Sequence, residues 1–301
     1  MSGPDLIPAD VRARLKGLRL VLRRVSGALG IGQHHSRSRG AGMEFAQYRA
    51  YEPGDEPRQI DWKLYARSDK FFVRESERDS PLAAWVLLDA TASMAQADAV
   101  RPGWSRLQAA KAQAACVFEL ACRQGDRFGL IVVSNNRLQV INAGSGTRHR
   151  DQCLKMLVAA DAAGTWPGEA DCRLVWERVH ANDLVLLLSD DFDEAVLGLI
   201  ERLAAARREV LNIQILTVEE REFPFRDGRR FIDVESGAEL LTDAGAARND
   251  YLQAFAAALR QLNLRLNSAG IRHVSYTLDE NIDAPLQRLF AQGKARFQES
   301  A

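Results

Sequence analysis

Short apolar runs alternate with segments of helical periodicity from Leu82 almost to the end of the chain, and this alternation constrains the fold more than any other feature. The runs are "LAAWVLLD", "RFGLIVVS", "RLQVINAG", "NDLVLLLSD", "EVLNIQILTV" and "IRHVSYTL". Helical segments lie near 105–124, 148–160, 172–180, 194–208 and 247–268. Continuous apolar strands between helices are typical of a parallel sheet covered on both faces. We therefore predict an α/β fold with a doubly wound, mostly parallel, Rossmann-like sheet. "RLQVINAG" follows its neighbour too closely for a crossover, so we expect it as an antiparallel edge strand.

Two parts of the chain fall outside this alternation. The stretch at about 219–243, with Gly228 and Gly237 expected at turns, predicts a β-hairpin insertion. Before the sheet, apolar residues at helical spacing from Pro8 to about Leu29 predict a basic amphipathic helix, and the turn-rich stretch after it predicts a small, mostly β module. We therefore expect two units, 1–81 and 82–301.

The overall composition excludes several classes of protein. Hydrophobic residues make up 47% of the chain, and 40 basic residues balance 40 acidic ones, so neither disorder nor attraction of the whole molecule to nucleic acid is indicated. The four cysteines have no metal-binding spacing, which favours buried, reduced thiols. The chain opens without a signal peptide and has no apolar stretch long enough to span a bilayer, so we expect a soluble, cytoplasmic protein.

The basic helix has three interpretations. Between residues 11 and 43 there are eight arginines and lysines and no acidic residue. Such a helix most often packs its apolar stripe and leaves its charges in solvent. Peripheral contact of the 11–24 segment with anionic lipid, or contact with nucleic-acid phosphates, is the alternative. Nucleic acid is not expected, because aromatic residues do not interleave with the basic ones.

Two of the predicted strands end in carboxylates, at Asp89 and at Asp190. In a doubly wound sheet, ligands bind at the carboxyl edge of the strands. Hard cations such as Mg²⁺ take oxygen ligands from several loops. The stretch "DATAS" offers Asp89, Thr91 and Ser93, while "AAGTWPG" offers Thr165 from a second loop and Asp190 comes from a third.

These five residues resemble the metal-ion-dependent adhesion site of von Willebrand factor type A domains, whose motif is D-x-S-x-S followed by a threonine and an aspartate on later loops. The resemblance implies a Mg²⁺ or Mn²⁺ ion whose open position takes a carboxylate from a partner protein. Thr91 departs from the motif but keeps the hydroxyl.

Alternatives to this assignment stay open at the level of sequence. Asp89 can instead cap its turn while the hydroxyls bond to backbone. Ser145 and Thr147 lie in another Gly-rich loop and compete with Thr165. Asp191 and Asp193 are expected in the first turn of a helix, where the helix dipole favours acidic residues.

A metal-dependent phosphohydrolase that uses Asp89 and Asp190 is the alternative function. A nucleophilic strand-end aspartate of the haloacid dehalogenase type is paired with a carboxylate two residues later, but position 91 is threonine. The chain also has no GxxxxGK[ST] loop and no G-x-S-x-G elbow. An enzyme is therefore not expected.

The segment before the sheet resembles the signature of the bacterial family catalogued as domain of unknown function fifty-eight. The matching residues are Gly42, Glu44, Phe45, Arg49, Tyr51, Gly54, Asp55, Arg58, Ile60, Asp61, Trp62, Ala66 and Arg67, and the hairpin is similar at Asp233, Glu235 and Gly237. These charged and aromatic residues either lock the module onto a neighbouring domain or form a docking surface. The resemblance implies a partner or adaptor of a MoxR-type AAA+ ATPase in protein maturation or complex assembly, with an acidic residue of a client as the ligand of the metal.

Overall fold

The computed structural model describes residues 6–20, 45–50, 60, 62–68, 70–76, 83–232 and 237–291. The chain divides into two compact units, Gly27–Pro81 and a larger unit that joins Met1–Ser26 to Leu82–Ala301. The predicted boundary after residue 81 coincides with this division. The first helix, however, belongs to the larger unit and not to the signature module.

The larger unit is built on a six-stranded sheet in the order β10-β7-β6-β3-β4-β5. Its strands are β3 (Ala83–Asp89), β4 (Arg127–Ser134), β5 (Arg137–Gly144), β6 (Leu184–Ser189), β7 (Glu209–Leu216) and β10 (Arg272–Thr277). Every pairing is parallel except that of β4 with the edge strand β5. The predicted doubly wound sheet and its antiparallel edge strand are confirmed. The strand order reverses between β3 and β6, which is where such sheets bind ligands.

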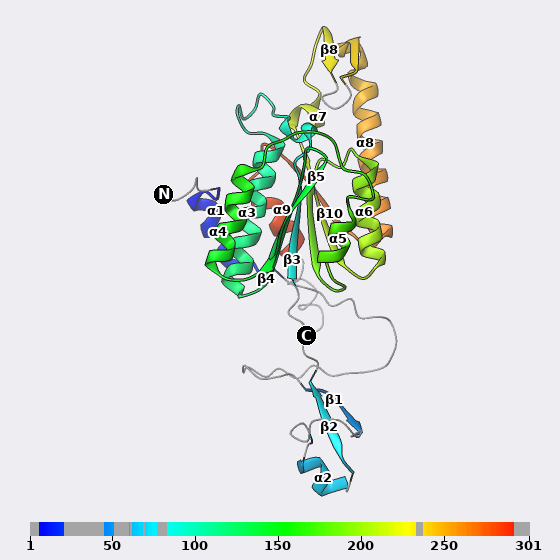
Figure 1. The fold of residues 1–301 in the computed structure, drawn as a ribbon. Helices are drawn as coiled ribbons and strands as arrows, with labels where there is room; N and C mark the ends of the chain where they lie inside the picture. The colour runs from blue at the N-terminus through cyan, green and yellow to red at the C-terminus, as the bar shows by residue number, and fades with distance from the viewer. Residues whose placement is uncertain are drawn as a thin grey trace, which may run out of the picture. The chain divides into compact units, whose positions relative to one another are not determined.

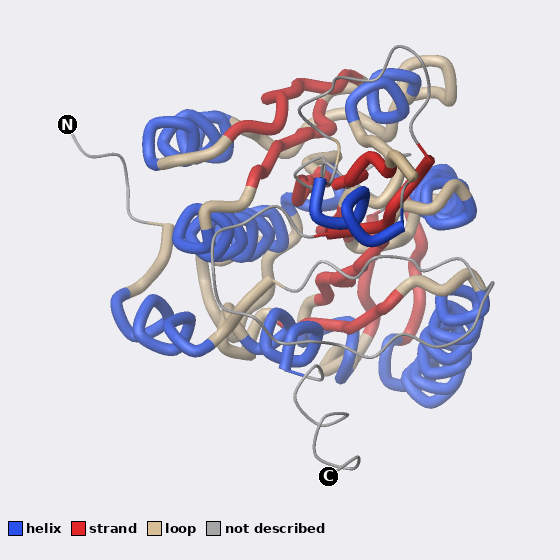
Figure 2. Tube along the Cα trace, turned by 90° about the horizontal axis from the view of Figure 1, so that it is seen from below, coloured by secondary structure: helices blue, strands red, loops and turns tan. Residues whose placement is uncertain are grey.

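Helices cover both faces of this sheet (Figure 1). On one face lie α1 (Ala9–Arg14), α3 (Arg106–Gln124), α4 (Thr147–Ala159) and α9 (Ala284–Ala291), and on the other lie α5 (Arg173–Arg178), α6 (Glu194–Ala205) and α8 (Ala244–Ser268). Viewed from below in Figure 2, the strands form the middle layer. All the predicted helices of this unit are present, and α9 is an addition that the sequence analysis did not predict.

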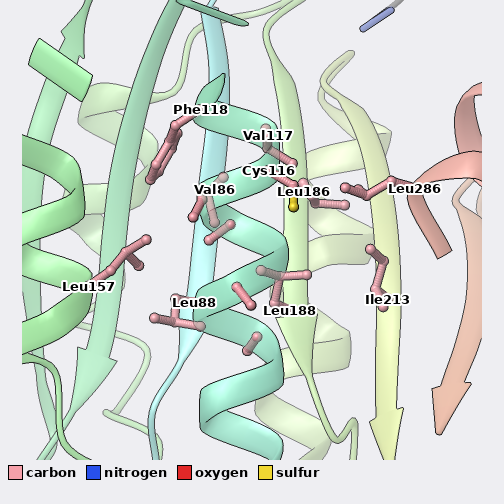
Figure 3. Close-up of a cluster of buried hydrophobic side chains, with 14 of the residues drawn as sticks. Val86, Leu88, Cys116, Val117, Phe118, Leu157, Leu186, Leu188, Ile213 and Leu286 are labelled. Atoms are coloured by element: carbon pink, nitrogen blue, oxygen red, sulfur yellow. The ribbon is translucent and has the colours of Figure 1, made fainter. Parts of the chain in front are cut away.

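Side chains of successive strand residues enter opposite cores. In β3, Val86 and Leu88 face α3, whereas Trp85 and Leu87 face the other layer. Figure 3 shows Val86 and Leu88 of β3 on the side of the sheet that α3 covers. Because both faces are buried, all seven residues of β3 are buried, which explains the continuous apolar run in the sequence.

The N-terminal helix is shorter than predicted. It ends at Arg14 and continues only as a 3-10 turn, η1 (Leu15–Gly17), after which Leu18 is extended. Residues 21–29 of the predicted basic helix lie outside the described residues. Val11 and Leu15 are buried, and Arg14 donates to the buried carboxylate of Asp283 at 2.8 Å, so the described part of the helix packs on the domain. Among the helices that the structure describes, none is both long and apolar enough to cross a bilayer.

The smaller unit contains β1 (Phe45–Ala50), paired antiparallel with β2 (Phe72–Ser76), and a helix, α2 (Trp62–Ser68). The prediction of a mostly β module was therefore wrong for "WKLYARS", which contains no glycine, proline or β-branched residue and forms a helix. The ring of Tyr65 stacks on that of Phe71, with 4.5 Å between the ring centres. The signature residues Asp55, Arg58 and Asp61 lie outside the described residues.

The predicted insertion is a short helix, α7 (Val218–Glu222), followed by the hairpin of β8 (Gly228–Ile232) and β9 (Glu239–Asp243). Gly228 was expected at a turn but pairs with Asp243 as the first residue of β8. Gly237 has a positive φ of 70°, as a turn glycine requires. The hairpin connects the end of β7 to α8 and projects beyond the sheet in Figure 1.

Candidate metal-ion site

The predicted site lies at the carboxyl edge of the sheet, between β3 and β6. Asp89 is the last residue of β3, and Asp190 directly follows β6. The two strands are hydrogen-bonded neighbours, with Leu88 opposite Leu188, so both carboxylates reach the same edge. Asp89 is 2% exposed and Asp190 is 3% exposed. Both carboxylates are therefore largely removed from water.

The turn after β3 gathers the oxygens of Asp89, Thr91 and Ser93. The backbone N–H and the hydroxyl of Thr91 donate to Asp89 Oδ1 at 2.9 and 2.7 Å. The Thr91 and Ser93 hydroxyl oxygens lie 3.2 Å apart. The turn thus caps itself through Asp89 and also brings a carboxylate and two hydroxyls together. Local sequence spacing is sufficient to produce this, because the three residues are within five positions of one another.

Ser189 completes the surroundings of Asp89. Its hydroxyl donates to Asp89 Oδ2 at 2.6 Å and accepts from the backbone N–H of Asp191 at 3.1 Å. Burial, and then the negative charge of Asp190, raise the pKa of Asp89 to about 6, against the hydrogen bonds from Ser189 and Thr91. A cation placed between these two carboxylates would relieve the repulsion that contributes to this shift.

The loop that carries Thr165 runs alongside this turn. The backbone N–H of Ala92 donates to the carbonyl of Gly164 at 2.9 Å. Gly164 has a positive φ of 68°, and a Cβ there would lie 2.6 Å from the Asn136 side-chain oxygen, so only glycine fits. Thr165 is exposed, and its hydroxyl donates to the Asn136 side-chain oxygen at 3.3 Å. Thr165 is therefore placed beside the turn, with its hydroxyl bonded to Asn136.

The competing hydroxyls of Ser145 and Thr147 lie elsewhere. Because β5 is antiparallel, its last residue, Gly144, pairs with Phe128 at the start of β4. Asp89 pairs with Val133 near the other end of β4. Ser145 and Thr147 therefore follow β5 at the amino edge, opposite the predicted site.

Asp190 is held by a side chain that the sequence analysis did not select. The guanidinium of Arg106, the first residue of α3, donates to Asp190 Oδ2 at 2.8 Å and to the carbonyl of Ser93 at 3.2 Å. It also pairs with Glu220 of α7. Arg106 is 4% exposed, so a full positive charge is buried at the centre of the edge.

Phe192 lies next to the Arg106–Asp190 pair and is exposed at the surface. Its ring centre is 5.3 Å from the Arg106 guanidinium carbon, within the range of a cation–π contact. The side chain is nevertheless 59% exposed. An exposed aromatic ring thus sits directly beside the buried polar cluster.

The two acidic residues expected in a helix's first turn behave differently. Asp193 caps α6, with its carboxylate accepting from the N–H of Ala195 at 2.8 Å, as predicted. The prediction was wrong for Asp191, which has a positive φ of 62° and turns into the sheet. There it accepts from the Asn212 amide at 2.6 Å, and burial raises its pKa well above the usual range.

Comparison with known proteins identifies the family. A family model described as "Protein of unknown function DUF58" matches residues 47–261, well over half of the chain. This chain belongs to that family. The strand order confirms the predicted doubly wound, mostly parallel sheet.

Similar proteins include mycobacterial ones. "Uncharacterized protein Rv1480" of Mycobacterium tuberculosis and "Uncharacterized protein Mb1516" of Mycobacterium bovis are each 27% identical over 299 residues, 95% of this chain and 91% of theirs. Among solved structures, BatB from Bacteroides thetaiotaomicron is 13% identical with a TM-score of 0.42, covering 73% of this chain and 100% of that one. The SpRpn10 VWA domain is 16% identical with a TM-score of 0.41, covering 69% and 94%.

The donor set at the carboxyl edge fits a hard divalent cation. Carboxylates and hydroxyls are the oxygen ligands that Mg²⁺ and Mn²⁺ accept, and the residues come from three adjoining loops. Within the described ranges, no group of three or more His, Cys, Asp or Glu side chains forms a metal cluster. An ion here would therefore depend on the neutral hydroxyls as well as on the carboxylates.

Sequence reasoning missed Arg106, Ser189 and Glu220. One signal for Arg106 was present, because a cation in the first turn of a helix opposes the helix dipole and needs a local reason. The first turn of α3 contains no acidic residue to compensate it. Ser189 directly precedes Asp190 and reads as the end of a strand, and Glu220 reads as a surface residue of the insertion.

Proposed function

We propose that this protein is a non-enzymatic protein-interaction module that uses a metal-ion-dependent adhesion site. Asp89, Thr91, Ser93, Thr165 and Asp190 would hold a Mg²⁺ or Mn²⁺ ion. When bound, the ion supplies a Lewis-acidic position for a carboxylate of a client protein. The observation that carries the proposal is the cluster of the Asp89, Thr91 and Ser93 oxygens at the strand-order reversal, where burial and the negative charge of Asp190 raise the pKa of Asp89.

The surroundings of the site also favour a protein as the ligand. Phe192 exposes its ring beside the oxygen cluster, and exposed aromatic side chains are enriched where proteins meet. The buried polar groups of the site are occupied by one another, as in the bonds from Thr91 and Ser189 to Asp89.

Metal binding is tested by titrating chelator-stripped full-length protein with Mn²⁺. Asp89→Ala is expected to abolish binding, because it removes the carboxylate around which the turn is organised. Ser145→Ala is the matched control, since it removes a hydroxyl at the opposite edge and should bind as the wild type does. Equal loss in both variants, or saturable turnover of generic phosphoesters that Asp89→Ala abolishes, would contradict the proposal.

We further propose that the module acts as a partner or adaptor of a MoxR-type AAA+ ATPase. Support comes from the resemblance of the signature residues, and the client is expected to present an acidic residue. The test is co-purification with such an ATPase and with clients, with and without chelator. Client capture should be lost with chelator and with Asp89→Ala. Capture that is indifferent to both treatments would remove the metal from the mechanism.

A further inference from the structure

Arg106 is buried at the carboxyl edge of the sheet. Its side chain is 4% exposed, and it contacts the turn after β3 through Ser93, the end of β6 through Asp190 and α7 through Glu220. The Asp190 side chain is equally buried, at 4% exposure. An ion pair removed from water in this way is costly to break, because either partner left alone is an uncompensated buried charge.

The same carboxylate is a ligand of the proposed adhesion site. An ion that binds Asp190 must either take Oδ2 from the guanidinium or share the carboxylate with it. In the first case a charge-assisted hydrogen bond is lost. In the second, a divalent cation sits close to a positive charge in a medium of low dielectric constant. Both cases weaken metal binding.

Glu220 can keep the Arg106 guanidinium paired after its hydrogen bond to Asp190 is broken. One oxygen of Glu220 pairs with Arg106, while the other accepts from the N–H and hydroxyl of Thr217 at 2.8 and 3.0 Å. The capping box of α7 therefore holds Glu220 in place whether or not Asp190 is paired. The guanidinium has one anchored carboxylate and one that it can exchange.

We propose that Arg106 is a built-in counter-cation that competes with the divalent ion for Asp190 and keeps the adhesion site in a state of low metal affinity. The exposed ring of Phe192 contacts the Arg106 guanidinium, so a partner that binds Phe192 also lies close to the positive charge that competes with the metal ion. The inference rests on the proposed adhesion site and names how that site is regulated.

The test is Mn²⁺ affinity, measured by calorimetry on chelator-stripped full-length protein. Arg106→Gln is expected to bind Mn²⁺ about tenfold more tightly, the factor that one charge-assisted hydrogen bond represents in an equilibrium constant. Arg106→Lys keeps the charge and should stay close to the wild type. Glu220→Gln leaves the arginine with Asp190 alone and should bind no more tightly. A purely structural role for Arg106 predicts the opposite sign, a loss of affinity in Arg106→Gln.

Arg106→Gln leaves Glu220 unpaired, so its folding is checked by circular dichroism. If it does not fold, the double variant Arg106→Gln/Glu220→Gln replaces it, compared with Glu220→Gln alone. The same tightening is expected there.

The outcomes separate this inference from the adhesion site itself. Binding by the wild type with no tightening in Arg106→Gln overturns the inference and leaves the site standing. Binding by Arg106→Gln alone supports the inference and shows that the wild type needs a partner to open its site. Absence of binding in both refutes both.

Discussion

Replacing Asp89 by asparagine is expected to stabilise the metal-free protein at neutral pH. The folded-state pKa of Asp89 is about 6, above its ordinary value of 3.8. The folded state therefore binds the proton more tightly than the unfolded state does, and the stability of the protein falls as the pH rises from about 4 through 6. Above pH 6 the full cost of the buried charge remains. Asparagine has nearly the same shape and carries no charge.

The magnitude follows from the shift. A rise from 3.8 to about 6 corresponds to about 3 kcal/mol at roughly 1.36 kcal/mol per unit. Asparagine keeps an oxygen for the Thr91 donors, but its amide faces the Ser189 hydroxyl, which must turn to accept, at a cost of about 1 kcal/mol. The net gain is about 2 kcal/mol at pH 7.5, and the electrostatic part falls to roughly half by pH 5.

Urea denaturation in the presence of chelator, at pH 7.5 and at pH 5, measures this. The matched control is Asp193→Asn, at a half-buried helix cap where asparagine serves nearly as well as aspartate, so its stability should change by less than about 1 kcal/mol and alike at both pH values. If Asp89→Asn were less stable than the wild type, or if its gain in free energy of unfolding were the same at pH 5 as at pH 7.5, then the buried charge of Asp89 would not destabilise the folded protein as argued.

Other substitutions test the packing and the proposed interface. Leu188→Ala, at a fully buried position of β6 labelled in Figure 3, should cost about 3 kcal/mol in the free energy of unfolding. Gly129→Ala would place a Cβ 2.5 Å from the ring of Trp85 and should destabilise the fold by about 1–3 kcal/mol in the same assay. Its control, Gly198→Ala in α6, meets nothing within 4 Å and should stabilise by up to about 1 kcal/mol. Phe192→Ala, at a ring that is 59% exposed, should change stability by less than about 1 kcal/mol yet weaken client capture in pull-downs.

Much of the fold is determined by the sequence alone. Strands buried on both faces must be apolar at every position, and helices that cover them must be amphipathic, so the alternation after Leu82 predicts a doubly wound sheet. The turn of Asp89, Thr91 and Ser93 is equally local, because a few residues suffice to bring its oxygens together. The strand-end position of Asp190 follows from the same pattern.

Other features were decided only by the tertiary structure. Arg106 and Asp190 are 84 positions apart, and a charged residue in a sequence predicts solvent until packing removes the water around it. Because β5 is antiparallel to β4, Ser145 lies at the amino edge of the sheet, opposite the predicted site. Because Asp191 has a positive φ, its carboxylate points into the sheet. Sequence thus determined which residues could reach the carboxyl edge. Which charges pair at that edge depends on how closely separate segments of the chain approach one another in the fold. The strength of an electrostatic interaction depends on the distance between the charges in space and not on their separation along the chain.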